Sequence, residues 1–530
     1  MTEDLFRLEQ ETARRRTFAI ISHPDAGKTT LTEKLLLLGG AIHLAGSVKS
    51  RKASRHARSD WMELEKQRGI SVTTSVLQFD YHGLRCNLLD TPGHQDFSED
   101  TYRTLTAADS AVMLIDAAKS VEPQTRKLFE VCHYAKLPVI TFINKCDRPG
   151  LSPLDLLDDI ETALGIRSCP INWPIEIGPN FRAVYDRQAE RLHVWDEQAN
   201  ETIIDGNLES DAVRDVIGAD AARHVAEEVA LLDVAGDPFD LERIRNGELT
   251  PVFFGSAHRT FGIRPFLDAL LELAPPPVLR NVASGDSDPN RSDFSGFIFK
   301  IQANMDPQHR DRFAFLRVCT GRFYRGMLVQ HPASPQKLRI TNPHIFLANE
   351  RILVEEAWPG DVVGIFAQDY FRIGDSLYEG AKIVFRGMPT FAPENFATLR
   401  IPNALKRKQL DKGLDQLVAE GAIQMFRRTG TFEGEPILAA VGELQFDVLL
   451  FRLQNEYGVE ATLRREPFTL ARWVFGTGFD PKKLNHLESV ACVKDRDGRD
   501  VVLLQAEWSQ RMVLDRCKGV ELLATAPPLH

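Results

Sequence analysis

One stretch near the start of the chain, residues 18–38, joins an apolar run to a helical pattern through a loop suited to phosphate. Phe18 to Ile21 is apolar enough for a buried strand, and Leu31 to Leu38 has the pattern of a helix that Gly39-Gly40 can end. The loop between them therefore points at a helix N-terminus. Free backbone N–H groups and the positive end of the helix dipole favour an anion there. The stretch predicts an α/β domain with a phosphate site.

The loop follows the pattern G-x-x-x-x-G-K-[ST], except that Ser22 replaces the first glycine. Serine is small enough to let the chain leave the strand. Lys28 can reach the β- and γ-phosphates of a nucleotide, and the Thr29 hydroxyl can ligate Mg²⁺. The alternative is a strand, turn and helix with a solvated lysine. The predicted nucleotide-binding residues of this loop are Ser22, His23, Pro24, Asp25, Ala26, Gly27, Lys28, Thr29 and Thr30.

Length and composition restrict the remaining possibilities. At 530 residues the chain is too long for one core, and roughly three or four domains are expected. We find neither a signal peptide nor an apolar run near the roughly 18 residues that span a bilayer, so a cytoplasmic protein is expected. Seven scattered cysteines, never spaced as C-x-x-C, favour reduced thiols over disulfides or zinc. A net charge of −10 excludes a generic polyanion binder, so contact with RNA would need local patches.

Two basic segments precede the next motif. Arg14 to Arg16 ends a possible short helix that starts at Leu5, and we interpret this run as a solvated helix terminus. Residues 48–58 contain five Lys or Arg and no acid. Such a segment is usually a solvated loop, and the alternative is a surface that faces RNA.

Hydroxyl side chains lie between this basic loop and an alternating strand that runs toward Phe79. A hydroxyl here could close a loop on Mg²⁺ and the γ-phosphate, and loss of that phosphate would release the loop. We assign this role to Ser71. Thr73 and Thr74 compete for it, and plain strand hydroxyls are the remaining alternative.

A second polar loop, Asp90-Thr91-Pro92-Gly93-His94, follows the strand at Asn87 to Leu89. The Asp90 carboxylate can hold Mg²⁺ through water, and Gly93 lets a backbone N–H approach the γ-phosphate. His94 could orient an attacking water, or it could be an exposed loop imidazole. The predictions are nucleotide contacts from Asp90, Thr91, Pro92, Gly93 and His94, Mg²⁺ ligands Thr29, Ser71 and Asp90, and His94 as the catalytic residue.

The segment that follows the apolar strand at residues 138–143 is predicted to select the nucleotide base. The Asp147 carboxylate can accept from both N1–H and the exocyclic amine of guanine, a pair that adenine does not present. A generic ATPase is therefore disfavoured. After a last strand near Val252, small residues could let backbone N–H groups approach the guanine O6. The predicted contacts are Asn144, Lys145, Asp147, Ser256 and Ala257, while Cys146 is expected to fill space.

The rest of the chain divides into further units. Phe181 to Tyr185 and Arg191 to Trp195 are typical of a hairpin within an insertion, and Ala274 to Pro277 forms a stiff linker. Beyond it, turns at all-β spacing predict a β-barrel, followed by an α+β pattern. The predicted fold class is multidomain α/β: a P-loop GTPase domain, a β-barrel and a C-terminal α+β domain, with boundaries at 1–278, 279–388 and 389–530.

Two amphipathic helices are expected in the last unit. Leu410, Leu414, Leu417 and Val418 share one helix face. A strand at residues 437–441 then leads into Gly442-Glu443-Leu444-Gln445-Phe446. This turn opens a second helix, whose inward face is predicted at Leu444, Val448 and Phe451.

Together these motifs resemble the translational GTPases of the elongation factor G and Tu group, and Asp90-Thr91-Pro92-Gly93-His94 is the sharpest marker. The resemblance implies that His94 positions the hydrolytic water when the factor is docked on the ribosome, and that Ile70 screens this water. Ser71 takes the place of the group's usual threonine. The strand and helix around Gly442 resemble the third domain of elongation factor G.

Residues 389–530 are too few for the extra domains of elongation factor G and too many for elongation factor Tu. Nearly the whole chain is similar to bacterial class II release factors. This resemblance implies GTP/GDP and Mg²⁺ as cofactors, and the ribosome, with its RNA and proteins, and class I peptide release factors as partners. It implies a monomer, without DNA or membrane, that hydrolyses GTP on the ribosome and promotes departure of class I factors. The alternatives are another translocase-like or recovery GTPase, or a GTP-controlled switch acting away from ribosomes.

Overall fold

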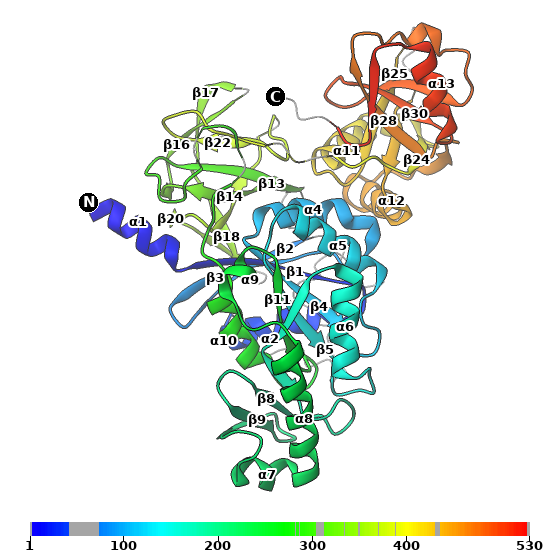
Figure 1. Ribbon diagram of the computed structural model, residues 1–530. Helices are drawn as coiled ribbons and strands as arrows, with labels where there is room; N and C mark the ends of the chain where they lie inside the picture. Colours follow the sequence, from blue (N-terminus) through cyan, green and yellow to red (C-terminus); the bar gives the residue numbers. More distant parts are fainter. Residues whose placement is uncertain are drawn as a thin grey trace.

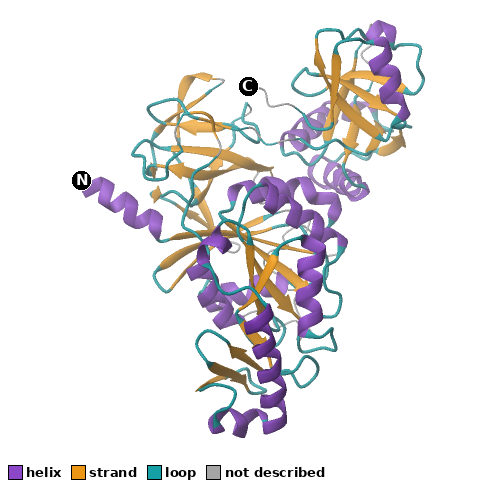
Figure 2. Cartoon of the chain, viewed as in Figure 1, coloured by secondary structure: helices purple, strands orange, loops and turns teal. Residues whose placement is uncertain are grey.

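The structure is a computed structural model, and it describes residues 3–41, 74–280, 282–285, 287–303, 312–332, 334–347, 350–368, 370–386, 388, 390–429 and 435–526. Ile70, Ser71, Thr73 and the basic segment 48–58 lie outside the described residues. Three units follow one another along the chain (Figure 1). Helices cover the sheet of the first, strands dominate the second, and the third combines both (Figure 2). This order confirms the predicted fold class.

The first unit is built on a seven-stranded sheet in the order β2-β3-β1-β4-β5-β11-β6. Its pairs are parallel except for the edge pair of β2 and β3. The strands are β1 (Arg15–Ser22), β2 (Ser75–Tyr81), β3 (Leu84–Asp90), β4 (Ser110–Asp116), β5 (Val139–Asn144), β6 (Arg167–Pro170) and β11 (Leu249–Phe254). Strand order reverses at β1, because β3 lies on one side of it and β4 on the other. The carboxyl end of β1 is therefore where an open α/β sheet binds its ligand.

Helices cover both faces of this sheet. Along β1, Ala19 and Ile21 face one core while Phe18 and Ile20 face the other, as the two-residue period of a strand requires. One face is covered by α4 (Ser98–Ala107), α5 (Pro123–Tyr134) and α6 (Pro153–Leu164). The other is covered by α2 (Lys28–Leu38), α9 (Leu241–Arg245) and α10 (Ile263–Leu273). Both faces of β1 are thus buried, which explains its continuous apolar run.

An insertion between β6 and α9 forms a small sheet in the order β10-β9-β8-β7. The predicted hairpin is confirmed, since β8 (Ala183–Asp186) pairs antiparallel with β9 (Arg191–Trp195). The other elements are β7 (Asn172–Pro174), β10 (Glu201–Asp205), α7 (Asp211–Ile217) and α8 (Ala219–Ala235). Figure 1 places this insertion at the end of the first unit that faces away from the other two units.

The second unit is all β. Its main sheet has the order β17-β16-β22-β13-β14-β21-β18-β19, and its core is apolar. The strands are β12 (Val282–Ser284), β13 (Ser295–Ala303), β14 (Arg312–Thr320), β15 (Phe323–Tyr324), β16 (Leu328–His331), β17 (Ser334–Arg339), β18 (His344–Leu347), β19 (Glu350–Leu353), β20 (Glu356–Ala357), β21 (Val362–Phe366), β22 (Ser376–Tyr378) and β23 (Val384–Phe385). It is the barrel unit expected after the proline-rich linker.

The third unit is an eight-stranded antiparallel sheet with helices. Its strands are β24 (Asn395–Arg400), β25 (Gln424–Arg428), β26 (Ile437–Ala440), β27 (Thr462–Arg465), β28 (Leu470–Gly476), β29 (Val490–Lys494), β30 (Asp500–Leu504) and β31 (Val520–Leu523). Its helices are α11 (Arg407–Ala419), α12 (Glu443–Tyr457) and α13 (Trp508–Arg516).

The predicted face of α11 is confirmed, because Leu410, Leu414, Leu417 and Val418 are all buried. The predicted face of α12 is partly wrong. Val448 is buried, but Leu444 and Phe451 are only half-buried, while Phe446, Leu449 and Leu453 fill the core. The N-terminal turn of this helix packs against the first unit, a contact that the local pattern does not reveal.

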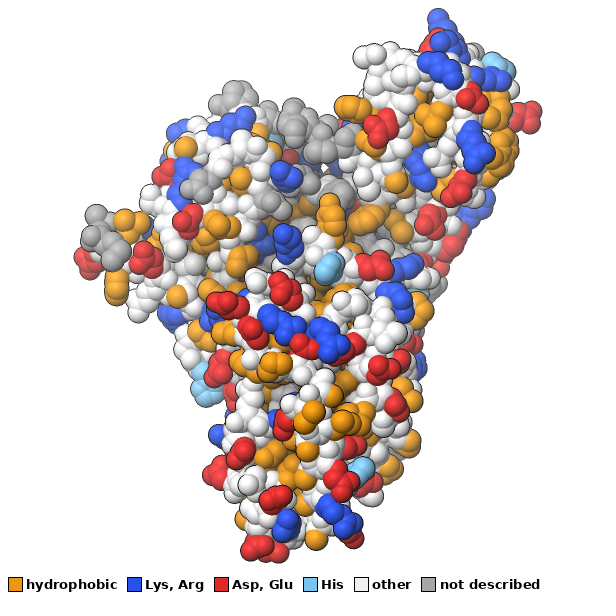
Figure 3. All heavy atoms as spheres, viewed as in Figure 1, with side chains coloured by type: hydrophobic (Ala, Val, Ile, Leu, Met, Phe, Trp, Pro, Cys, Tyr) orange, Lys and Arg blue, Asp and Glu red, His pale blue; other side chains and the backbone are white. Residues whose placement is uncertain are grey.

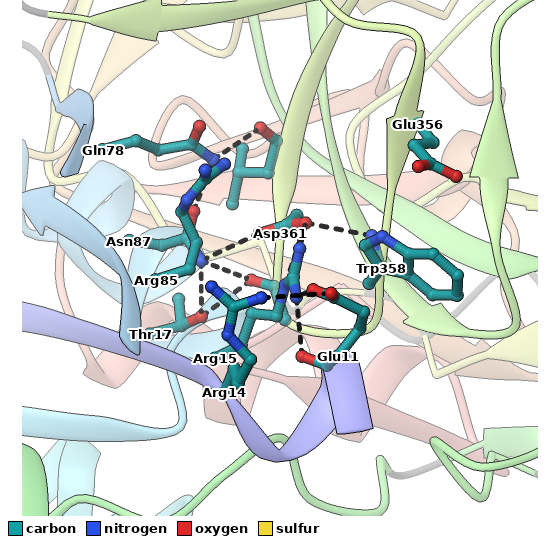
Figure 4. A network of polar contacts seen from close by, with 12 residues as sticks. Glu11, Arg14, Arg15, Thr17, Gln78, Arg85, Asn87, Glu356, Trp358 and Asp361 are labelled. Carbon is teal, nitrogen blue, oxygen red and sulfur yellow. Dashed lines mark hydrogen bonds and ion pairs between the residues drawn. The ribbon is translucent and has the colours of Figure 1, made fainter. Parts of the chain in front are cut away.

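The interpretation of Arg14 to Arg16 as a solvated helix terminus is wrong for Arg15 and Arg16, which begin strand β1. Arg15 is only 5% exposed. It pairs with Glu11 of α1 (Glu3–Ala13) and, at 3.2 Å, with Asp361 of the barrel unit (Figure 4). A buried guanidinium needs such partners, and one of them comes from another unit.

A second buried cluster joins the same two units. Asp109, next to β4, pairs with both Arg280 and Arg317. The Thr17 hydroxyl on β1 donates to the Gly360 carbonyl at 2.7 Å. Removing one member of a buried ion cluster leaves an unpaired charge, which costs about 3–5 kcal/mol. The barrel unit is therefore fastened to β1, the strand that leads into the phosphate loop.

Candidate guanine nucleotide site

The phosphate loop runs from the end of β1 to the first residue of α2. Asp25 and Gly27 have positive φ angles of 66° and 101°, which turn the loop back over the start of the helix. A Cβ on Gly27 would lie 2.4 Å from the Asn144 Nδ2 atom, so only glycine fits there. The loop thus has the tight backbone that a helix N-terminus needs to bind phosphate.

The remaining predicted residues of this loop differ in exposure. Ala26 is buried, and Ser22 is buried with no hydrogen-bond partner for its hydroxyl among the described residues. His23 lies 3.2 Å from Glu122 through Nε2. Pro24 and Thr30 are half-buried beside the loop. All of them stay predictions as nucleotide contacts.

Lys28 and Asp90 meet beneath the loop, where Lys28 Nζ lies 2.6 Å from Asp90 Oδ1. The other oxygen, Asp90 Oδ2, is buried and has no hydrogen-bond partner within the described part of the chain. An unpartnered buried carboxylate oxygen is costly, and a hard divalent cation such as Mg²⁺ would satisfy it. Thr29, next to Lys28, carries the hydroxyl predicted as a second oxygen ligand. The donor set around Lys28 therefore fits Mg²⁺.

The loop after β3 approaches the phosphate loop through Gly93. A Cβ on Gly93 would lie 3.7 Å from the Pro24 Cα atom and 3.9 Å from Lys28 Cε. The Thr91 hydroxyl donates to the Ile20 carbonyl at 2.6 Å, so Thr91 fixes this loop to β1 rather than facing a ligand. Pro92 is buried beside it. Gly93 is thus the member of this loop that lies near the phosphate loop, and its contact with a γ-phosphate stays a prediction.

Thr74, a competitor of Ser71, is engaged elsewhere. Its hydroxyl donates to Asp100 Oδ2 of α4 at 2.7 Å. The structure therefore gives Thr74 a structural role at the start of β2.

Asn144 and Lys145, at the end of β5, tie the loops of the site together. Asn144 Nδ2 donates to the Ala26 carbonyl at 2.8 Å, and Asn144 Oδ1 accepts from the Ala257 amide at 2.8 Å. Lys145 Nζ donates to the Asp25 carbonyl at 2.5 Å. The segment predicted to select the base thus also holds the phosphate loop in place.

The Asp147 carboxylate, predicted to select the base, accepts a hydrogen bond at one of its oxygens. The Ser256 hydroxyl donates to Asp147 Oδ1 at 2.6 Å. The backbone amides predicted to approach the guanine O6 are already used, since Ser256 N donates to Phe261 and Ala257 N to Asn144. Ser256 therefore contributes by orienting Asp147. Cys146 fills space as expected: it is buried, and burial raises the pKa of its thiol.

His94 caps the short helix η1 (Gln95–Phe97). Its Nδ1 atom accepts from the Asp96 amide at 3.3 Å and lies 3.3 Å from the Asp96 carboxylate. The imidazole packs edge-on against Phe97, with 6.4 Å between ring centroids. Nε2 has no protein partner among the described residues. The ring is thus held at one nitrogen while the other can contact water.

Two acidic residues outside the predicted set belong to this region. Asp116, at the end of β4, lies 2.8 Å from Lys145 Nζ. Its place directly after an apolar strand was the available signal. Asp96 contacts both His94 and the third unit, and no local pattern indicated the second contact.

The sheet, the phosphate loop and the Asn144 to Asp147 segment define a GTPase of the translation factor class. Residues 13–276 match the elongation factor Tu GTP-binding domain, and residues 293–380 match elongation factor G domain 2. Residues 385–514 match the C-terminal domain of class II release factor RF3. The chain belongs to the peptide chain release factor 3 family, and it is a translational GTPase of termination.

Relatives match over nearly the whole chain. Peptide chain release factor 3 of Symbiobacterium thermophilum is 54% identical over 523 residues, 98% of this chain and 99% of the relative. The protein of the same name from Microcystis aeruginosa is 52% identical over 97% of this chain and 95% of the relative. A solved structure from Thermus thermophilus has a TM-score of 0.70 at 25% identity, and the match covers 91% of this chain and 72% of that one. Among the described residues, we find no helix long and apolar enough to cross a membrane.

Proposed function

We propose that this chain binds the post-termination ribosome and, in its GTP state, promotes departure of a class I peptide release factor. Hydrolysis then lets the chain itself leave. The observation that supports this most directly is a release factor relationship that spans almost the whole chain, together with a predicted guanine site in which Ser256 holds Asp147. We further propose a cytoplasmic monomer that does not use DNA as a partner.

The proposed reaction is in-line attack of water on the γ-phosphate. His94 would orient the water through Nε2, while Lys28 and the phosphate-loop amides take up the charge that develops on the phosphate oxygens. Asp147 would hold the guanine ring. Thr29 and Asp90, with Ser71 as a further proposed ligand, would hold Mg²⁺, which supplies charge neutralisation when bound.

The same contacts support a conformational switch. A nucleotide moves an equilibrium between two shapes only if it binds one of them more tightly. The γ-phosphate contacts proposed for Gly93 and Ser71 exist with GTP and are lost with GDP.

We also propose domain boundaries at 1–278, 279–388 and 389–530. In support of them, each sheet formed by the described residues lies within one of these three ranges.

The proposal is tested on termination complexes after peptide release. Departure of a labelled class I release factor is scored with GTP, GDP and a non-hydrolysable GTP analogue. We expect GTP to give repeated rounds of departure, the analogue to give a single round, and GDP to give slow departure. Departure that is equally slow with and without this protein would refute the proposal and favour another ribosomal GTPase.

Contact with ribosomal RNA needs a local basic surface, because acidic and basic side chains are interspersed over the face seen in Figure 3. The third unit has a cleft of about 600 Å³ between β25, α11 and the turn after β29. Its charged lining consists of Arg427, Arg428, Lys494 and Arg496, with Asp415 and Asp495. Asp495 pairs with Arg499 at 2.7 Å, Arg428 with Glu466 at 3.2 Å and Lys494 with Asp500 at 2.9 Å. Neither Arg427 nor Arg496 forms an ion pair with a described residue, so we propose that this cleft receives an RNA phosphate backbone.

Charge reversal at the cleft should weaken ribosome binding. We expect Arg427→Glu/Arg496→Glu to raise the ribosome Kd about tenfold or more and to lower the slope of log Kd against log salt by about 2. The matched control is Arg126→Glu/Arg223→Glu, which reverses two exposed arginines of the first unit. An equal effect in both variants would show that net charge alone is responsible.

A further inference from the structure

Asp96 lies between the GTPase centre and the third unit. It follows His94 by two residues, and only 8% of it is exposed. Its Oδ1 atom is 3.3 Å from His94 Nδ1, and its Oδ2 atom accepts from the Leu444 amide at 2.8 Å. One carboxylate therefore contacts the proposed catalytic imidazole with one oxygen and the N-terminal turn of α12 with the other.

The N-terminal turn of α12 has no cap of its own for the Leu444 amide. Its N-cap residue is Gly442, which has no side chain. The Gln445 side chain accepts from the Val441 and Gly442 amides and leaves the Leu444 amide to Asp96. A carboxylate at this position satisfies a free amide and interacts favourably with the helix dipole. Asp96 thus acts as the cap of α12 from another domain.

The space around Gly442 shows how closely the two units fit. A Cβ there would lie 2.1 Å from Asp96 Cγ and 2.5 Å from Asp96 Oδ1. Its φ of −129° and ψ of 159° are open to any residue. The absence of a side chain at 442 is therefore required by Asp96 and not by the backbone.

Further contacts hold the adjoining helix α4 against the same unit. Arg103 Nη1 donates to the Gly421 carbonyl at 3.4 Å and also pairs with Glu99. Tyr102 packs edge-on against Phe391, with 5.1 Å between ring centroids. The segment that begins with His94 is therefore docked on the third unit along its length.

We propose that Asp96 is a positioning residue for GTP hydrolysis, and that it orients His94 only while α12 is docked on its carboxylate. A protonated Nδ1 donates to Asp96 Oδ1, and an unprotonated Nδ1 accepts from the Asp96 amide. In both cases residue 96 sets the ring plane and hence the direction of Nε2. Hydrolysis is thereby coupled to the placement of the third unit. The inference rests on the proposed role of His94.

The test variant is Gly442→Ala, which forces Asp96 away without altering His94 or the nucleotide site. A displacement of about 1 Å in a catalytic group costs about 100-fold in rate, so we expect kcat for ribosome-stimulated GTP hydrolysis to fall by about that factor. The Michaelis constant for ribosomes should change by no more than about threefold, because binding surfaces are kept. The control, Glu443→Ala, alters an exposed residue of the same helical turn and should keep kcat within about twofold.

Substitutions at Asp96 test the positioning role of this residue independently. Asp96→Ala should lower kcat about 100-fold, and adding Gly442→Ala should lower it little further, since both break one contact. Asp96→Asn keeps an acceptor for Leu444 and a donor for Nδ1, so it should recover about tenfold over alanine.

The outcomes separate this inference from the proposed function. His94→Ala is measured in parallel; if it hydrolyses GTP normally, the proposed role of His94 fails. If His94→Ala is inactive while Gly442→Ala keeps its kcat, the positioning role of Asp96 fails alone. A raised ribosome Michaelis constant with unchanged kcat in Gly442→Ala would also overturn it, because that is the signature of an interface effect.

Discussion

Replacing His94 with alanine is expected to abolish ribosome-stimulated GTP hydrolysis. The variant retains Lys28, Asp90 and the phosphate loop, so GTP should still bind with an affinity within about threefold of the original. A partner can supply up to about 10⁵-fold in GTP hydrolysis, and positioning of the attacking water is a large part of that factor. We expect the loss in single-turnover rate at saturating ribosomes to be about 10³-fold or more.

The measurement compares rates with and without ribosomes. Without ribosomes both proteins should hydrolyse GTP slowly, since no sequence motif indicates an arginine finger supplied by the chain itself. His133→Ala is a suitable control because that histidine is an exposed residue of α5, remote in sequence from the motif. Unchanged stimulated turnover in His94→Ala would remove this residue from the mechanism.

The local elements of the site could be predicted from the sequence because each depends on neighbours in the chain. The strand, loop and helix from Phe18 to Leu38 follow from an apolar run, two glycines and a helical pattern. The order of the motifs along the chain then predicts that their loops lie at one edge of the sheet. Polar loops that follow parallel strands meet at this edge irrespective of the other domains.

Contacts between units could not be predicted in this way. Arg15 is a solvated side chain by its local pattern, and only the position of Asp361 makes it a buried ion pair. The contact between the first turn of α12 and Asp96 is likewise not indicated by any local pattern. Both contacts join residues hundreds of positions apart, which periodicity and spacing do not specify.

The backbone amides of Ser256 and Ala257 form other contacts than the predicted ones. Small residues at Ser256 and Ala257 do permit a close approach of backbone, but the structure directs that approach to Phe261 and Asn144. No sequence pattern indicates that the Ser256 hydroxyl donates to Asp147. Its 2.6 Å hydrogen bond decides which way a residue at position 147 faces.

Asp147→Asn is expected to move nucleotide preference from GTP to XTP. Asparagine Oδ1 can accept from the Ser256 hydroxyl as the carboxylate does. The amide nitrogen then faces the base, where it can donate to the extra oxygen of xanthine but cannot accept from guanine. Two charge-assisted hydrogen bonds are lost, at about 1.5–3 kcal/mol each, so GTP affinity should fall about 100-fold or more.

Competition between labelled GTP and unlabelled GTP or XTP measures this shift, with Asp158→Asn on the exposed side of α6 as the matched control. Undiminished GTP affinity would refute the assignment of Asp147. A variant that had merely unfolded would bind neither nucleotide, whereas a redirected site should hydrolyse XTP on ribosomes. Such a variant should also promote departure of the class I release factor with XTP, whereas the original protein should use XTP poorly. We expect this because the pocket that selects the base would also control the conformational switch of this GTPase.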